Sequence, residues 1–315
     1  MAEKQKYRDI THLAAVLHPL GVNVESAQLI RSNTNLVYDC GDRILRLTPA
    51  TVRDRVDVQT EIDWLTFLGR EGVNVVQVLG GGEPIELAIE QEVFWGICFK
   101  KIQGAKIAAD QWKTAHFEGL GDLLGQLHKI GKGYPIRSDL SYRHWDEIPE
   151  FYSFEYFPDD NRQLRRLHNE VVHELKRLPQ ETANYGLIHY DVHHGNYLLT
   201  SEQKIVLFDF ELVCQSWYIH DVATVLYYAC NHPASKQYRS FDELFLSHFW
   251  LGYEQHHQIS EMEKEKIPLF LLYRDLMVYG YLLQIWGNKE LSQQEQAYKA
   301  RVESSIAARR MILDG

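Results

Sequence analysis

The sequence predicts an α+β fold with two lobes, a small antiparallel-sheet lobe followed by a mainly helical one. Strand-like runs are concentrated in the first third of the 315 residues, and long apolar stripes with helical spacing dominate the remainder. The change of character places the first lobe at residues 1–103 and the second at 104–315. An apolar content of 45% and a charged content of 24% are typical of a globular protein with an ordinary core.

The first lobe opens with apolar side chains at helical spacing over residues 8–20, closed by a proline and a glycine. Alternating runs between residues 27 and 47 then predict a strand hairpin that turns at Gly41 and Asp42. The other elements expected in this lobe are a helix at 51–69, strands at 75–79 and 93–102, and between those strands a loop through Gly80–Gly82 and Pro84.

The second lobe is expected to consist of long helices at 116–130, 160–178, 221–230, 241–256 and 266–286. Three strand-like runs, LIHYD, NYLLT and KIVLFDF, interrupt them between residues 187 and 210. These three runs lie around the most informative motif of the chain.

Composition and charge exclude several classes of function. The first residues, MAEKQKYRDI, lack an apolar leader, and no run of about 18 apolar residues occurs, so we expect a cytoplasmic protein without a membrane partner. The net charge of −10, without a long Lys/Arg run, argues against nucleic acid as a partner and is compatible with a cationic small molecule. The four cysteines are far apart, which predicts core thiols and no disulfide framework. The sequence carries no signal for the oligomeric state.

The segment GLIHYDVHHGNYLLTSEQKIVLFD holds the most informative pattern in the chain. It contains His189 and Asp191, then Asn196 five residues after Asp191, and Asp209 at the end of an apolar run. Phosphoryl transfer needs one carboxylate that orients and deprotonates an acceptor hydroxyl, together with oxygen ligands for the magnesium ions that bridge the ATP phosphates. A carboxylate such as Asp209 directly after a buried strand is costly unless it is paired or bound to a metal ion.

The order H-x-D-x4-N, followed by an apolar strand and an aspartate, resembles the protein-kinase-like fold. The run His193-His194-Gly195-Asn196 is similar to the corresponding part of H-G-D-x-H-x-G-N in the aminoglycoside phosphotransferase and choline kinase-like family. That family includes choline, homoserine and antibiotic kinases. The resemblance implies an ATP-dependent (or GTP-dependent) kinase that uses Mg²⁺ and phosphorylates a hydroxyl of a small molecule.

The same resemblance implies roles for residues of the motif. Asp191 matches the catalytic base, and Asn196 and Asp209 match the magnesium ligands. His189 matches a residue that supports the catalytic turn from beneath. Asp221 matches an aspartate that bonds the backbone of the catalytic loop, and an aspartate there also suits the positive end of a helix dipole.

In the first lobe, Arg46 stands where the family usually has a lysine that contacts the α- and β-phosphates. Arginine keeps the positive charge and grips phosphate with different geometry. The resemblance implies that Glu61 is its ion-pair partner; the less favoured interpretation is an exposed charge on a helix.

The resemblance also implies that two further segments of the first lobe bind the nucleotide. The loop at residues 31–35 lacks the usual glycines, but Ser32, Asn33 and Asn35 offer hydrogen-bond donors for phosphate. The strand that ends near Gly104 resembles the hinge of the family, in which backbone groups around Phe99 and Lys101 bond the adenine.

Several charged residues have two interpretations. Arg274 and Asp275 lie in a strongly apolar run and therefore need partners, either in an ion pair with another helix or in the acceptor pocket. Glu211 either adds to the metal site or faces solvent, and we expect it to face solvent.

Other functions are weighed against the small-molecule kinase. A Ser/Thr protein kinase of the same fold is less favoured, because Asp209-Phe210-Glu211 lacks the glycine of D-F-G and no activation segment is recognisable. A non-catalytic pseudokinase is favoured only by Arg46 and the missing glycines. A zinc hydrolase could use the cluster His189, Asp191, His193 and His194 with His220 and Asp221, but it leaves Asn196 unexplained. The sequence does not identify the acceptor.

Overall fold

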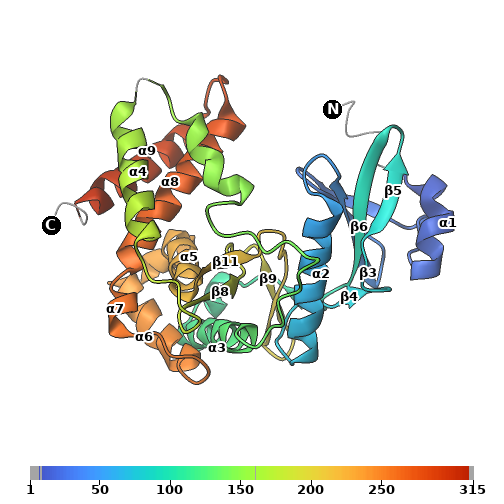
Figure 1. Ribbon diagram of the computed structural model, residues 1–315, viewed down its shortest axis with the longest axis horizontal. Helices are drawn as coiled ribbons and strands as arrows, with labels where there is room; N and C mark the ends of the chain where they lie inside the picture. Colours follow the sequence, from blue (N-terminus) through green and yellow to red (C-terminus); the bar gives the residue numbers. More distant parts are fainter. Residues whose placement is uncertain (1–6, 8, 160, 312–315) are drawn as a thin grey trace. The chain divides into compact units, whose positions relative to one another are not determined.

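The computed structural model describes residues 7, 9–159 and 161–311 of the chain (Figure 1). The chain forms two compact units. The first contains the chain up to Ile107 together with residues 133–142 and 195–211, and the second contains residues 108–132, 143–194 and those from 212 onward. The sequence placed the boundary at residue 103, whereas the first unit extends to Ile107 and includes two further segments from later in the chain.

The first unit is built on an antiparallel sheet, as the sequence predicted. Its strands are β1 (Gln28–Ser32), β2 (Leu36–Asp39), β3 (Arg43–Pro49), β4 (Val78–Leu79), β5 (Ile85–Ile89) and β6 (Glu92–Lys100), in the order β1-β2-β3-β6-β4 with β5 also paired to β6. The segment 75–79, expected to be a strand throughout, forms one only at Val78–Leu79, and β5 lies where the sequence indicated a loop. The neighbouring glycines and Pro84 conceal the short alternating run of β5.

Two helical segments accompany this sheet. The first is α1 (Ala14–Leu17), flanked by 3₁₀ turns at Thr11–Leu13 and His18–Leu20. Gly21 follows the second turn in the left-handed conformation, with a φ of 74°. The second is α2 (Arg55–Arg70), which begins where the Asp54 side chain accepts a bond of 2.8 Å from the Asp57 N–H. The apolar stripe expected on this helix, formed by Val58, Ile62, Leu65 and Leu68, is buried throughout.

A second, three-stranded sheet completes the first unit. It consists of β7 (Gly104–Ala105), β9 (Tyr197–Thr200) and β10 (Ile205–Leu207), with β9 in the middle. An isolated bridge between Val75 and Leu207 connects this sheet to the segment before β4. Two of the strand-like runs assigned to the helical lobe therefore belong to the first unit.

The second unit is mainly helical, as predicted. Its helices are α3 (Thr114–Gly131), α4 (Arg162–Lys176), α5 (Tyr218–Asn231), α6 (Phe241–Tyr253), α7 (Glu261–Lys264), α8 (Ile267–Trp286) and α9 (Gln293–Arg310). It also contains a 3₁₀ segment at Pro149–Tyr156 and a two-stranded antiparallel sheet of β8 (Tyr185–Ile188) and β11 (Cys214–Trp217). The sequence did not reveal β11 or α9. Helix α9 is polar on most of its surface and buries only Val302 and Ile306, so its apolar stripe is too thin to recognise. In the part of the chain that is described, no helix combines the length and apolar character needed to span a bilayer.

Helices α3 and α6 cross in close backbone contact. A Cβ atom on Gly121 of α3 would lie 1.9 Å from the carbonyl oxygen of Phe249 on α6, and one on Gly252 of α6 would lie 2.0 Å from the carbonyl oxygen of Glu118. Glycine is therefore required at these crossing points. The crossing places Tyr253 of α6 against the C-terminal half of α3, where its hydroxyl bonds His128.

Candidate active site

The turn after β8 is held in an unusual backbone conformation by a buried aspartate. Tyr190 has a φ of 72°, which bulky side chains rarely adopt. Asp221, near the start of α5, accepts the Tyr190 N–H at 2.7 Å with one carboxylate oxygen and the His189 N–H at 2.9 Å with the other. Asp221 therefore bonds the backbone of this turn at two successive residues, and the strained turn presents Asp191.

Further side chains fix Asp221 and the turn. Burial alone would raise the pKa of Asp221, but the hydrogen bond and charge of His128 and the contacts of His189 lower it overall. The His128 Nε2 atom lies 3.2 Å from the Asp221 Oδ2 atom, and its Nδ1 atom lies 2.7 Å from the Tyr253 hydroxyl. His189 is fully buried and its Nδ1 accepts the Asp191 N–H at 3.2 Å. This contact is the one expected of a residue that supports the turn.

Cationic or proton-donating side chains of the second unit, among them Arg274 and His193, contact the carboxylate of Asp191. Its Oδ1 atom forms an ion pair with Arg274 of α8, and its Oδ2 atom lies 3.3 Å from the His193 Nε2 atom. Burial would raise the pKa of Asp191, but Arg274 and His193 more than compensate and hold it well below the ordinary aspartate value. Asp191 is therefore ionised throughout the neutral pH range.

Arg274 and Asp275 have different partners, although they are neighbours on α8. The Arg274 guanidinium is 6% exposed, and its Cζ atom lies 5.3 Å from the ring centre of Tyr190 and 5.2 Å from that of Tyr228. Asp275 forms an ion pair with Arg309 of α9. The expectation of an ion pair with another helix is thus correct for Asp275, whereas Arg274 pairs with the candidate base.

In the first unit, Arg46 and Glu61 form the expected ion pair. The Arg46 Nη2 atom on β3 lies 2.6 Å from the Oε2 atom of Glu61 on α2, and Glu61 is fully buried rather than exposed. The sequence did not indicate Arg53, whose Nη1 atom also lies 2.6 Å from the same oxygen. Burial would raise the pKa of Glu61, but the two guanidinium groups lower it to about 2.

Asp209 and Asn196 lie close together at one end of the β9–β10 hairpin. The pairing of Tyr197 with Leu207 continues as a hydrogen bond of 2.9 Å from the Phe208 N–H to the Asn196 carbonyl oxygen. Asp209 follows with a φ of 68°, in the left-handed region. Its Oδ1 atom lies 3.7 Å from Arg46 Nη1, and its Oδ2 atom lies 3.4 Å from Arg31 Nη1.

These two residues suit a magnesium ion. A carboxylate and an amide supply the oxygen atoms that Mg²⁺ prefers, and Mg²⁺ is commonly held by one or two protein ligands plus phosphates and water. Among the described residues, no group of three or more His, Cys, Asp or Glu side chains has an arrangement that could hold a metal ion. The histidine-rich motif therefore does not form the closed cluster that the zinc hydrolase interpretation requires.

Glu211 was expected to face solvent, and this expectation is wrong. Its Oε2 atom accepts a hydrogen bond of 2.6 Å from the Asn35 side chain, and the residue is half-buried. Burial first, and then the charge of Asp209, raises its pKa. Asn35 ends the loop between β1 and β2. Ser32, the last residue of β1, is half-buried, and Asn33, in the loop, is exposed. Asn35 was expected to offer its side chain to phosphate, and here it donates to Glu211.

The hinge-like strand β6 uses its backbone inside the sheet. Phe99 pairs with Ile44 on one side and Val78 on the other. The Lys101 N–H donates to the Asp42 carbonyl oxygen at 2.9 Å, so in this conformation it is not available to an adenine. The Phe99 ring lies 5.4 Å from the Arg46 Cζ atom, which places it beside the Arg46–Glu61 pair.

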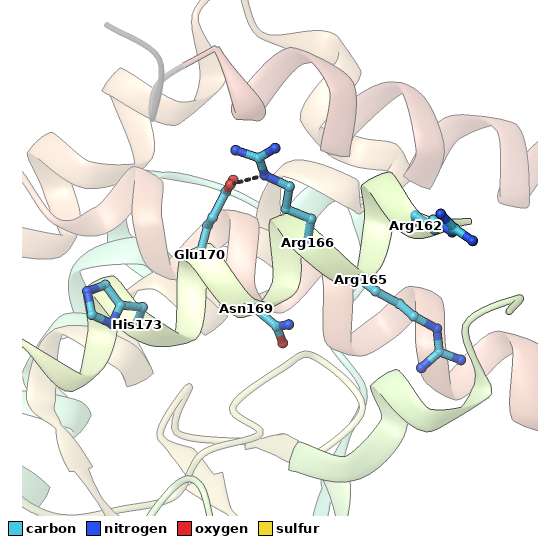
Figure 2. Close-up of a pocket in the computed structure, with 6 residues that line it drawn as sticks. All are labelled: Arg162, Arg165, Arg166, Asn169, Glu170 and His173. Carbon is cyan, nitrogen blue, oxygen red and sulfur yellow. Dashed lines mark hydrogen bonds and ion pairs between the residues drawn. The ribbon is translucent and has the colours of Figure 1, made fainter. Parts of the chain in front are cut away.

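A surface hollow on α4 is lined by a different set of residues from the candidate site. Figure 2 shows side chains that project from this one helix, with an ion pair of 2.7 Å between Arg166 and Glu170. The hollow is lined by Arg162, Arg165, Arg166, Asn169, Glu170 and His173. None of the candidate site residues is among them, so this hollow is not the candidate active site.

Comparison with known proteins defines the class. A family model described as a phosphotransferase enzyme family matches residues 10–257. The chain therefore belongs to this family, and its relatives show it to be a small-molecule kinase. It is 27% identical over 314 residues to the amicoumacin kinase of Bacillus subtilis (strain 168), an alignment that covers 96% of this chain and 93% of that protein. It is also 27% identical over 179 residues to homoserine kinase of Caulobacter vibrioides (strain NA1000 / CB15N), over 56% of this chain and 55% of that protein.

Solved structures confirm the kinase-like fold. An amicoumacin kinase in complex with AMP-PNP, Ca²⁺ and Ami superposes with a TM-score of 0.87 at 26% identity, over 97% of this chain and 96% of that chain. A microcompartment-associated aminopropanol kinase superposes with a TM-score of 0.76 at 19% identity, over 97% and 98%, and shows the fold alone.

Proposed function

We propose that the protein transfers the γ-phosphoryl group of ATP to a hydroxyl of a small amine-bearing acceptor, with Asp191 as the catalytic base. The observation that supports this most directly is the turn after β8. A buried Asp221 bonds two successive backbone N–H groups there and presents an ionised carboxylate five residues before Asn196. A kinase needs a carboxylate fixed in this way, because catalysis of phosphoryl transfer depends mainly on positioning and charge.

Each residue has a defined task in this proposal. Asp191 orients the acceptor hydroxyl and accepts its proton as the bond to phosphorus forms. Arg46, held by Glu61, contacts the α- and β-phosphates. Asn196 and Asp209 hold Mg²⁺, which neutralises charge on the β- and γ-phosphates when it is bound.

The backbone of the nucleotide-binding loop has a task as well. In the proposal, Ser32 at the end of β1 and Asn33 in the loop that follows contribute donors to the phosphates. In the proposal, the adenine bonds backbone groups around Phe99 and Lys101. The Lys101 N–H is not one of them, because it donates to the Asp42 carbonyl oxygen.

The amine-bearing acceptor is supported by charge and by the relatives. The net charge of −10 favours a cationic ligand over an anionic one. One relative named for its acceptor is a homoserine kinase, and homoserine carries both a hydroxyl and an amine. A choline/ethanolamine kinase family protein shares the fold.

The test is a panel measurement of Mg²⁺-dependent nucleotide consumption by the pure protein. Acceptors are amicoumacin, 1-amino-2-propanol, homoserine, choline, ethanolamine and spectinomycin, each with ATP and with GTP. Glycerol serves as an uncharged polyol and casein as a protein acceptor. Turnover with an amine-bearing member supports the proposal. Turnover with casein alone would instead establish a protein kinase, and turnover with glycerol alone would exclude the amine requirement.

A further inference from the structure

Arg274 is a buried cation that the family motif does not include. Its side chain comes from α8, far along the chain from the catalytic turn, and is 6% exposed. The guanidinium meets the Oδ1 atom of Asp191 and is flanked by the rings of Tyr190 and Tyr228. Within the described residues, its Nε atom has no hydrogen-bond partner. A buried guanidinium is costly, so its contacts with the turn need an explanation.

We propose that Arg274 is a positioning residue for the phosphoryl-transfer reaction, which fixes the rotation of the Asp191 carboxylate toward the acceptor hydroxyl. The inference rests on the proposed function, in which Asp191 is the base. The Oδ1 atom of Asp191 cannot turn away from α8 without breaking its ion pair with Arg274. The two aromatic rings restrain the guanidinium in turn. The Asp191 carboxylate is therefore held by a side chain of α8 as well as by its own loop.

The neighbouring ion pair on α8 shows what a purely structural pair looks like in this unit. Asp275 and Arg309 connect α8 to α9, and Ser305 adds a hydrogen bond of 2.7 Å to Asp275. That pair involves two helices and no residue of the turn. Arg274 differs because its partner is the side chain that the mechanism uses. Arg309→Met is thus a matched control, since it also removes one guanidinium from an ion pair on α8.

The kinetic experiment compares Arg274→Met, Arg274→Lys and Arg309→Met. A misplaced catalytic group can cost about 100-fold in rate, so Arg274→Met is expected to lower kcat by roughly that factor while KM for Mg-ATP changes less than about threefold. Arg274→Lys keeps the charge but loses the planar fork, so it should recover part of the loss. Arg309→Met should retain the wild-type kcat. A kcat for Arg274→Met equal to that of Arg309→Met would overturn the proposal.

A second readout does not depend on the acceptor. Carbon-13 carboxyl NMR of aspartate-labelled protein reports the titration of Asp191, with the resonance assigned by its loss in Asp191→Asn. Among the described residues, the groups that face this carboxylate include Arg274 from α8, Tyr228 from α5, and His189 and His193 from the loop. Removal of the Arg274 charge disfavours the ionised form, so the titration midpoint should rise in Arg274→Met and remain low in Arg309→Met.

The two readouts separate failure of this inference from failure of the proposed function. A wild-type protein that phosphorylates no acceptor but shows the shifted midpoint in Arg274→Met would refute the proposed function and support the contact between Arg274 and Asp191. An unchanged midpoint in folded Arg274→Met, verified by circular dichroism, would refute the positioning role whatever the activity. If Arg274→Met does not fold, Arg274→Lys provides the same comparison with a smaller expected shift.

Discussion

The buried charge cluster around Glu61 allows a quantitative prediction for Glu61→Gln. The substitution keeps the shape of the side chain but removes the negative charge that both Arg46 and Arg53 contact at 2.6 Å. The pKa of Glu61 is lowered from its ordinary 4.5 to about 2 in the folded protein. This shift corresponds to about 3 kcal/mol of stabilisation of the folded state by the ionised carboxylate. Removal of one partner from a buried ion pair typically costs about 3–5 kcal/mol, so the two arguments agree.

The assay is urea unfolding of wild type, Glu61→Gln and the control Glu83→Gln, followed by circular dichroism and tryptophan fluorescence. Glu83 forms an ion pair of 2.9 Å with Arg55 at the surface, where such a pair is worth less than about 1 kcal/mol. Because the folded pKa of Glu61 is depressed, its stabilisation is complete above pH 4.5 and is lost as the pH falls to about 2. The free-energy difference between wild type and Glu61→Gln should shrink over that range. Equal losses for Glu61→Gln and Glu83→Gln at pH 7 would refute the reasoning.

Three further predictions follow from contacts of named residues. Gly121→Ala should destabilise the protein by about 1–3 kcal/mol in urea unfolding, because the new Cβ would clash with the Phe249 carbonyl oxygen. Gly69→Ala has open space around it in α2 and should stabilise the protein by about 0.5–1 kcal/mol, so a destabilised Gly69→Ala would contradict this prediction. Asp221→Asn should lower kcat by roughly tenfold or more in steady-state assays without weakening Mg-ATP binding, because one acceptor oxygen cannot hold both backbone N–H groups of the turn; unchanged kcat would contradict it. By calorimetry, Arg46→Lys should bind Mg-ATP within about threefold of the wild-type affinity, whereas Arg46→Met should bind it at least about tenfold more weakly. Equal affinities of the two variants would show that Arg46 does not contact the phosphates.

The fold was largely predictable because its elements carry clear periodicity. The stripe of α2 and the β2–β3 hairpin follow from spacing and turn residues alone. Helix α9 was missed because it buries only Val302 and Ile306, which is too weak a pattern to separate from a polar segment. The short strand β5 was missed because glycines and Pro84 dominate its neighbourhood.

The candidate site was predictable only where its residues form a motif or match one by resemblance. Asp191 and Asn196 are five residues apart, and the Arg46–Glu61 pair follows from the resemblance of the first lobe. The pairing of Arg274 with Asp191 spans 83 residues, and no local pattern encodes it. A charge in an apolar helix indicated only that Arg274 needed a partner. Arg53 gave no signal, because an arginine before a helix is ordinarily a surface residue.

The role of Asp191 as the base of a small-molecule kinase can be tested by separating phosphate transfer from nucleotide binding. The measurement is transfer of labelled γ-phosphate from ATP to the best acceptor of the panel by wild type and Asp191→Ala, with Mg-ATP affinity of both proteins measured by calorimetry. We expect Asp191→Ala to bind Mg-ATP nearly as tightly as wild type and to transfer phosphate at least about 100-fold more slowly. Transfer at the wild-type rate, or a parallel loss of binding and transfer, would contradict it.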